Sequence, residues 1–159
     1  MSAKVVSVDE LARISKALRA EGRRLVVTNG CFDLLHVGHV RYLQAARTFG
    51  DALAVGVNGD ASVRTLKGEG RPLNRENDRA EVLAALASVD YVAIFQEVRA
   101  TRFLEKVQPA VYVKGGDYKP ETLDAEERGV LEKLGAEIRI IPFQAGYSTS
   151  RLIEKINCA

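Results

Sequence analysis

The sequence predicts an α/β protein in which a parallel five-stranded sheet is covered by helices on both faces. Five short runs are apolar throughout, without the alternation of polar and apolar residues that a half-exposed strand shows. Segments with apolar residues three and four positions apart separate these runs, which is typical of alternating strands and helices. The 159 residues, 47% of them hydrophobic and 28% charged, suit a single domain, 1–159, with a buried core.

The first predicted element is a helix within residues 1–23. Ser7 is a typical N-cap residue, and acidic residues fill the first turn that follows it. Apolar residues then recur at helical spacing, at Leu11, Ile14 and Leu18. Gly22 ends the helix. We expect it to pack against a core formed by residues 24–157 and to take no part in the chemistry.

The remaining elements follow from the apolar runs and the turn residues between them. Strands are expected at Leu25–Val27, Ala52–Val57, Tyr91–Phe95, Ala110–Val113 and Glu137–Ile141. Helices are expected at 40–49, with a start near Val37, and at 76–88, 99–107 and 123–134, with a last helix opening at 146–150. The apolar stripe expected for helix 76–88 consists of Val82, Leu83, Leu86 and Val89.

The segment Arg64–Arg75 is predicted to be a long polar loop. It contains two glycines and a proline, together with four cations, Arg64, Lys67, Arg71 and Arg75. Loops of this length in a compact α/β domain are usually functional or mobile. Two interpretations are equally supported by these residues alone, a basic flap over phosphate groups and a solvated surface loop.

Composition excludes several classes of protein. The net charge of +2 gives no general argument for nucleic-acid binding. The two cysteines, Cys31 and Cys158, have neither metal-site nor disulfide-framework spacing. No apolar run approaches the roughly 18 residues of a membrane span, and the N-terminus lacks the apolar core of a signal peptide. We therefore expect a cytoplasmic protein without a nucleic-acid or membrane partner.

The segment Thr28–His39 has the composition of an anion site. It joins the first apolar run to a helix, and in parallel sheets such loops commonly hold the ligand. Gly30 and Gly38 allow close approach of the backbone, and the helix directs free N–H groups at the loop. His36 and His39 share one face of the first turn and can donate hydrogen bonds to phosphate oxygens. Taken alone, the pair also fits a partial metal site or a structural role.

Two later loops carry similar residues. Lys114–Pro120 follows the fourth strand, and Gly146–Ser150 opens the last helix. Ser148 or Thr149 would serve as an ordinary N-cap there, and the same Ser-Thr-Ser run would equally serve as a phosphate cradle. Familiar motifs for other functions are absent from the sequence. It contains no G-x-G-x-x-G, no G-x-x-x-x-G-K-[ST] and no G-x-S-x-G.

The run Gly30-Cys31-Phe32-Asp33-Leu34-Leu35-His36-Val37-Gly38-His39 resembles the (T/G)-x-F-D-x-x-H-x-G-H signature of the nucleotidyltransferase superfamily. This resemblance implies a Rossmann-like three-layer sandwich with strand order 3-2-1-4-5. In that order the chain reverses between strands one and four, and the loops Thr28–His39 and Lys114–Tyr118 flank the crevice.

Five further stretches are similar to the D-glycero-β-D-manno-heptose 1-phosphate adenylyltransferase family, and the similarity extends over almost the whole chain. They are 28–33, 57–63, 66–72, 113–120 and 147–150. In many members this domain is fused to a sugar kinase, and the present chain resembles the free-standing form. The chain has Tyr147 where the fused members often have cysteine, which affects local packing rather than the chemistry.

The resemblance implies transfer of AMP from ATP to a sugar 1-phosphate, with release of pyrophosphate and formation of ADP-heptose for surface glycans. Mg²⁺ would enter with the triphosphate, and no metal ligands are expected from the protein. A homodimer or higher homo-oligomer is the family habit. Two alternatives stay open: another substrate on the same fold, as in glycerol-3-phosphate cytidylyltransferase or FAD synthetase, and a nucleotide-binding module without catalysis.

The resemblance also assigns roles to residues. The catalytic residues would be His36, His39 and Lys67. The nucleotide would be bound by Thr28, Asn29, Gly30, Cys31, Phe32, Gly38, Lys114, Gly116, Asp117, Ser148, Thr149 and Ser150. The sugar phosphate or the triphosphate would be bound by Asp33, Asn58, Asp60, Arg71 and Arg79. For Asp33, orientation of the loop is the alternative role.

Overall fold

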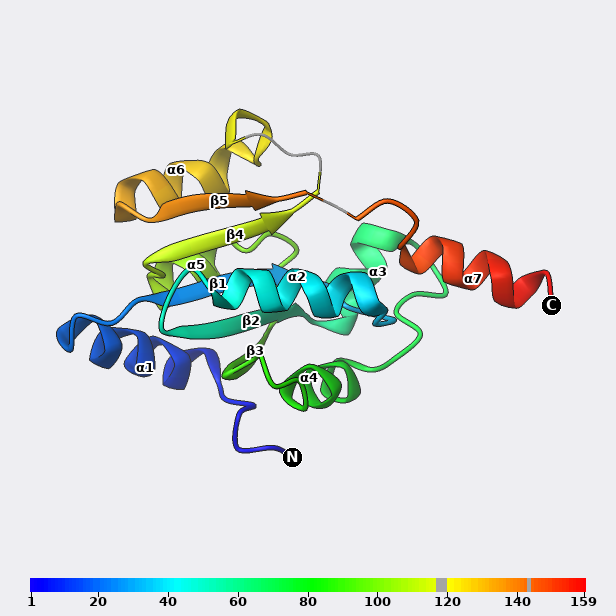
Figure 1. Ribbon diagram of the computed structural model, residues 1–159, viewed down its shortest axis with the longest axis horizontal. Helices are drawn as coiled ribbons and strands as arrows, with labels where there is room; N and C mark the ends of the chain where they lie inside the picture. Colours follow the sequence, from blue (N-terminus) through cyan, green and yellow to red (C-terminus); the bar gives the residue numbers. More distant parts are fainter. Residues whose placement is uncertain (117–119, 143) are drawn as a thin grey trace.

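The computed structural model describes residues 1–116, 120–142 and 144–159. Its strands form one parallel five-stranded sheet in the order β3-β2-β1-β4-β5, which confirms the expected order (Figure 1). The strands are β1 (Leu25–Gly30), β2 (Ala52–Asn58), β3 (Tyr91–Phe95), β4 (Val111–Gly115) and β5 (Glu137–Ile141). β1 lies at the centre of the sheet. Strands β2 and β3 are added on one side of it, and strands β4 and β5 are added on the other.

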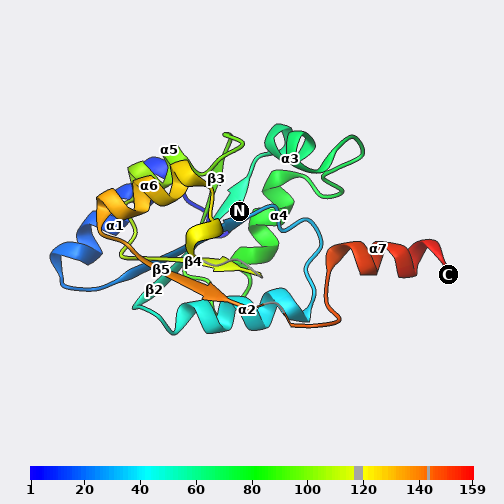
Figure 2. The same cartoon turned by 90° about the horizontal axis from the view of Figure 1, so that it is seen from above.

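Helices cover both faces of this sheet, as Figure 2 shows. They are α1 (Val8–Ala20), α2 (Val37–Arg47), α3 (Asp60–Lys67), α4 (Glu76–Ala84), α5 (Thr101–Val107), α6 (Ala125–Leu134) and α7 (Thr149–Asn157), with a 3-10 turn at Pro120–Thr122. Helices α1, α5 and α6 pack on one face, and α2 and α4 pack on the other. None of the helices in the described part of the chain is long and apolar enough to cross a membrane.

The core explains why the strands are apolar at every position. Val27 belongs to the buried cluster under α1, α5 and α6, whereas its neighbour Val26 belongs to the cluster under α2 and α4. Successive strand residues point to opposite faces, so a strand covered on both faces buries all of them. Both valines are fully buried.

The expected helix at the N-terminus is confirmed. Ser7 is the N-cap of α1, and its hydroxyl accepts a hydrogen bond of 3.1 Å from the Glu10 N–H. Leu11 and Leu18 are buried in the cluster that α1 shares with α5 and α6. Gly22, just beyond the helix, has a φ of +71°, a conformation that glycine adopts without strain.

The segment 64–75 is not one long loop, because its first part is helical. Helix α3 extends to Lys67, so Arg64 and Lys67 lie on its last turn. Gly59 caps the helix with extended backbone, and Asp60 places a negative charge at its positive end. Only two residues of the helix are buried, Ser62 and Val63. So short an apolar signal is easily read as a loop.

Several other boundaries differ by a few residues from the expectation, and those of α4, β1 and β4 bear on the site. Helix α4 ends at Ala84 rather than Ser88, and its buried face consists of Arg79, Ala80, Leu83 and Ala84. Val82, which was assigned to the apolar stripe, is 52% exposed. Strands β1 and β4 extend to Gly30 and Gly115 because parallel pairing continues there, with Gly30 opposite Val57 and Gly115 opposite Ile141.

Two glycines of opposite environment test this packing. A methyl group on Gly56 of β2 would lie 2.7 Å from Phe103 Cε1, whereas a methyl group on Gly129 of α6 meets no atom within 4 Å. We expect Gly56→Ala to lower the free energy of unfolding by about 1–3 kcal/mol through overpacking. Gly129→Ala should raise it by roughly 0.5–1 kcal/mol, because alanine is the better helix former. Urea unfolding measures both; equal effects would contradict this packing.

Candidate active site

The two histidines lie at the N-terminus of α2, directly beyond the carboxyl end of β1. His36 is the N-cap residue, and His39 lies in the first turn. Their rings stack with centroids 3.9 Å apart and an interplanar angle of 27°. The His36 backbone N–H donates a 3.3 Å hydrogen bond to His39 Nδ1, which assigns the proton of a neutral His39 to Nε2. That N–H remains available to a ligand.

Both imidazoles are held in the neutral form. Burial lowers the pKa of His36 from its usual 6.5. Burial, followed by the neighbouring His36, lowers the pKa of His39 to about 4. In the described part of the chain, His36 Nδ1 is one of two buried side-chain atoms without a hydrogen-bond partner, the other being Thr101 Oγ1. Buried polar atoms without partners are costly, and an unpaired imidazole nitrogen at a helix N-terminus fits a ligand-binding site.

Gly38 keeps the space around this pair. A methyl group on Gly38 would lie 2.9 Å from His36 Cε1 and Nδ1, and 3.0 Å from Tyr147 Cβ. Any larger residue would therefore displace the His36 ring. The requirement for glycine here comes from contact with a site residue and not only from approach to a ligand.

Phe32 adopts strained backbone at the same loop. Its φ of +47° lies in the left-handed region, which is uncommon for residues other than glycine. The conformation brings its ring edge-on to His39, with centroids 5.6 Å apart. A methyl group on Gly30 would lie 3.1 Å from the Phe32 ring. Strain of this kind is typical of functional sites. Here it holds the Phe32 ring against one side of the histidine pair.

The N-terminus of α7 meets the histidine loop. Ser148 is the N-cap of α7 and accepts a 3.1 Å hydrogen bond from the Arg151 N–H, which agrees with the N-cap interpretation. Thr149 Oγ1 donates to the Leu34 carbonyl at 3.2 Å. The Tyr147 ring lies over His36 with centroids 6.3 Å apart. Two helix N-termini, with Ser150 exposed on the second, therefore come together beside the histidines.

The Asp33 carboxylate is bonded to the neighbouring loop, residues 71–74. Its carboxylate is 2% exposed and accepts hydrogen bonds of 2.9 Å from the backbone N–H groups of Leu73 and Asn74. Arg71 Nε donates to it at 2.7 Å. These donors hold the pKa of Asp33 below its usual value despite the opposing effect of burial. The alternative role given to Asp33 therefore fits its contacts better than phosphate binding.

Three more residues assigned to ligand binding use their side chains within the protein. Thr28 Oγ1 lies 2.7 Å from the Tyr42 hydroxyl, and Asn29 Oδ1 accepts from the Tyr112 hydroxyl at 2.7 Å. Asn58 is buried, and its amide donates to Ser62 Oγ at 2.8 Å. Strand ends buried on both faces need such partners for their polar side chains. These side chains support the site without facing it.

The Arg79 side chain also bonds within the protein. It was expected to contact phosphate, but it is fully buried and forms an ion pair of 2.8 Å with Asp60. Its other hydrogen bonds go to the carbonyls of Cys31 and Asn74. A cation in the first turns of a helix opposes the dipole, and this placement is explained by the buried acceptors around it.

Lys67 lies exposed at the end of α3 and, among the described residues, has no hydrogen-bond or ion-pair partner. Burial raises the pKa of the Cys31 thiol, and the positive charges of Lys67, Arg79 and Arg71 oppose that shift. The positive charge of Lys67 therefore influences the electrostatics of the loop that precedes the histidines. This arrangement supplies an exposed cation at the edge of the site.

On the β4 side of the crevice, Lys114 is half-buried in the strand. Gly116 has a φ of +121°, and its N–H donates to the Ile141 carbonyl at 3.0 Å. Asp117, assigned to the nucleotide, lies outside the described residues.

Sequence reasoning missed Asn74, Glu76, Gln96 and Tyr42, which hold the site in place. Asn74 pairs with Asp33, and Glu76 accepts from Gln96 and from the Asp60 N–H. Nothing in the local sequence marks these partners, because most of the contacts join segments far apart in the chain. In the described residues, no group of three His, Cys, Asp or Glu side chains could hold a metal ion.

The fold and the site together define a nucleotidyltransferase-type α/β domain. Residues 27–155 match the family described as cytidylyltransferase-like, and the chain belongs to this family. It is 56% identical over 154 residues, 97% of its length, to the "Bifunctional protein HldE" of Geotalea uraniireducens. It is 54% identical over 155 residues to the protein of the same name in Geobacter sulfurreducens. The chain spans 31% of the length of these relatives.

A solved structure supports the same family. The lipopolysaccharide core biosynthesis protein of Thermoplasma volcanium is 30% identical, with a TM-score of 0.64. The match covers 77% of this chain and 98% of that one.

The neutral state of His39 predicts a pH-dependent contribution to stability. The unfolded side chain takes up a proton near pH 6.5, whereas the folded one resists protonation until about pH 4. The unfolded state therefore binds more protons in this window, and the free energy of unfolding falls as the pH falls through it. His39→Gln lacks this titration. Urea unfolding of both proteins at several pH values should show their stability difference shifting in favour of the variant below pH 6.5; a constant difference would contradict the assignment.

Proposed function

We propose that this chain transfers AMP from ATP to D-glycero-β-D-manno-heptose 1-phosphate, giving ADP-heptose and pyrophosphate. The observation that carries the proposal is the stacked, neutral pair His36 and His39 at the N-terminus of α2. Their unused ring nitrogens and the free N–H groups of the helix form a set of donors suited to phosphate oxygens.

The reaction follows from this donor set. A sugar phosphate is already ionised near neutral pH, so its oxygen attacks the α-phosphorus of ATP in line without a general base, and pyrophosphate leaves. Catalysis then consists of positioning and of stabilising charge on the transferred group. His39 Nε2–H donates to the phosphates, and the stacked His36 ring at the N-cap supplies a second imidazole beside it.

Cations and the second helix N-terminus complete the site. Lys67 on α3 neutralises the triphosphate, and Arg71 can contact phosphate with its remaining N–H groups while Asp33 holds its Nε. Ser148, Thr149 and Ser150 at the start of α7 bind the β- and γ-phosphates. Lys114, Gly116 and Asp117 line the opposite side of the crevice.

The triphosphate would carry Mg²⁺ into the site, and the ion would neutralise charge on the leaving group there. The described part of the site offers two neutral imidazoles and several cations, while the carboxylates of Asp33 and Asp60 are occupied by arginines. This donor chemistry fits a metal carried by phosphate oxygens.

The substrate is inferred from sequence similarity. The five family-like stretches, the identity to proteins named "Bifunctional protein HldE" and the likeness to a lipopolysaccharide core biosynthesis protein support a heptose phosphate. The cytidylyltransferase-like family description favours one second candidate, transfer of CMP from CTP, for which the superfamily resemblance implies glycerol 3-phosphate as the acceptor. We further propose that the chain acts in the cytoplasm, as one catalytic domain and as a homodimer or higher homo-oligomer.

Pyrophosphate release tests the proposed reaction. The protein is incubated with Mg²⁺ and either ATP plus D-glycero-β-D-manno-heptose 1-phosphate or CTP plus glycerol 3-phosphate. Release only in the first mixture is expected. Release only in the second would move the substrate assignment. No release from protein that still binds ATP would favour a binding module.

Removing either histidine should slow turnover. We expect His36→Ala and His39→Ala to lower kcat by about 10²–10³-fold, the cost of losing one transition-state donor. Steady-state kinetics measures the effect, and circular dichroism verifies folding. Activity close to that of the unchanged protein in a folded variant would refute the role.

Lys67→Ala should lower kcat/KM to a similar degree, because it removes a cation from the triphosphate. Arg64→Ala is the matched control, since it removes a cation from the same exposed turn of α3. An effect of Lys67→Ala on melting temperature alone would make this turn structural.

A further inference from the structure

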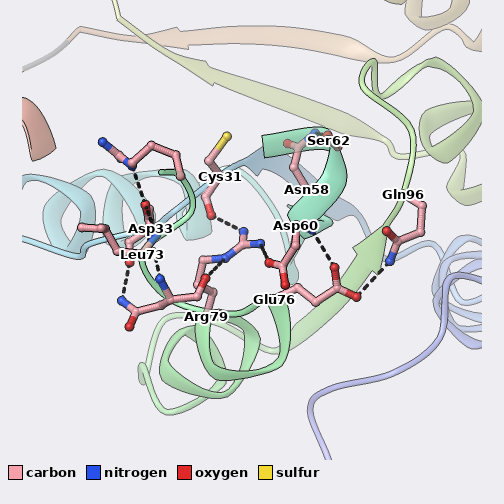
Figure 3. A network of polar contacts seen from close by, with 11 residues as sticks. Cys31, Asp33, Asn58, Asp60, Ser62, Leu73, Glu76, Arg79 and Gln96 are labelled. Carbon is pink, nitrogen blue, oxygen red and sulfur yellow. Dashed lines mark hydrogen bonds and ion pairs between the residues drawn. The ribbon is translucent and has the colours of Figure 1, made fainter. Parts of the chain in front are cut away.

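Arg79 joins three separate segments of the site through one buried guanidinium (Figure 3). Its Nη1 donates to the Cys31 carbonyl at 2.6 Å, its Nε to the Asn74 carbonyl at 3.0 Å, and its Nη2 to Asp60 Oδ1 at 2.8 Å. We propose that Arg79, paired with Asp60, is the positioning residue that fixes the histidine loop, the loop before α4 and helix α3 relative to one another.

Each contact leads to a different part of the machinery. Cys31 immediately precedes the strained Phe32, whose ring lies against His39. Asn74 is the residue through which Asp33 holds the loop that carries Arg71. Asp60 is the first residue of α3, the helix that ends at Lys67. Moving the guanidinium therefore moves the histidines and both cations relative to each other.

The pair formed by Arg79 and Asp60 is itself held in place by a residue that follows β3. Glu76 accepts a 2.7 Å hydrogen bond from the Asp60 N–H and a 3.0 Å hydrogen bond from the Gln96 side chain. Figure 3 shows this chain running from Gln96, beyond the end of β3, through Glu76 and Asp60 to Arg79. A methyl group on Gly59 would lie 2.1 Å from Gln96 Oε1, so the turn before α3 is also closed against this brace.

Burial excludes direct contact of this guanidinium with substrate as it stands. The Arg79 side chain is 0% exposed, while its partner Asp60 is 32% exposed. Arginine suits the position because its planar fork donates in several directions at once and stays charged. Its effect on the reaction is therefore transmitted through Cys31, Asn74 and Asp60.

This inference rests on the proposed function only for its kinetic readout. The first variant, Arg79→Met, keeps the apolar stem of the side chain and removes its hydrogen-bond donors. The second, Arg79→Lys, keeps the positive charge but donates hydrogen bonds in fewer directions. Displacements of about 1 Å in a site can cost about 10²-fold in rate. We expect Arg79→Met to lower kcat for pyrophosphate release by about 10²-fold with a smaller change in KM for ATP, and Arg79→Lys to recover part of the loss.

A second readout needs no substrate. The chain contains two histidines, so each imidazole gives its own resonance in a ¹H–¹³C correlation spectrum. Both resonances should move in ligand-free Arg79→Met and move less in Arg79→Lys. If Arg79→Met does not fold, Arg79→Lys carries the same test.

Arg47 provides the matched control at the opposite edge of the sheet. Its guanidinium also binds two carbonyls, those of Gly50 and Asp51 at 2.7 and 2.6 Å. It also pairs with one carboxylate, that of Asp90 at 2.8 Å. Arg47→Met should lower stability without moving the histidine resonances or kcat.

The outcomes separate the possibilities. Unmoved histidine resonances with unchanged kcat in folded Arg79 variants would overturn the proposal. Unmoved resonances with a raised KM for ATP would also overturn it and would make Arg79 a substrate contact. If the unaltered protein releases no pyrophosphate, the proposed function fails while the resonances still decide the positioning role.

Discussion

Strand β1 is hydrogen-bonded on both sides, to β2 and to β4, and the position of its carboxyl end fixes the rest of the site. The order in which strands are added to the sheet reverses at β1. The connections on its two sides therefore diverge and leave a crevice. Helix α2 begins seven residues beyond Gly30, with its free N–H groups at that edge. Tyr42 on α2 ties the arrangement together, because its hydroxyl contacts Thr28 of β1 and the Val113 carbonyl of β4.

The histidine pair shows how burial prepares a neutral donor. Burial lowers the pKa of both imidazoles, the neighbouring His36 lowers that of His39 further, and the His36 backbone fixes the tautomer of His39. Gly38, Phe32 and Tyr147 enclose the pair, each through a direct contact with one of the rings. The positive charge at the site therefore comes from outside the pair, from Lys67 on α3 and Arg71 on the following loop.

The sequence predicts the fold well because buried parallel strands leave a local pattern, and all five strands were expected within three residues of their ends. The strand order came from the resemblance, since no local pattern specifies which strands pair. The positions of the histidine pair and of Ser148 at helix N-termini could also be predicted, because the signals for a helix start are local. The contacts of Arg79, Asp33 and Asn58 within the protein could not be predicted, because a polar residue that binds ligand and one that braces a buried loop look alike in sequence. Only contacts across 38 to 48 positions, such as those of Arg71 and Arg79 with the histidine loop, distinguish them.

The central claim is that a neutral His39, protonated on Nε2, donates to the nucleotide phosphates. Long-range ¹H–¹⁵N correlation spectra of the two histidines, recorded near pH 7 with and without Mg²⁺ and a non-hydrolysable ATP analogue, test it most directly. The account predicts the Nε2–H tautomer of His39 in the free protein, and a shift of that nitrogen when the analogue binds. An Nδ1–H tautomer, or nitrogen resonances unchanged at saturating analogue, would contradict it.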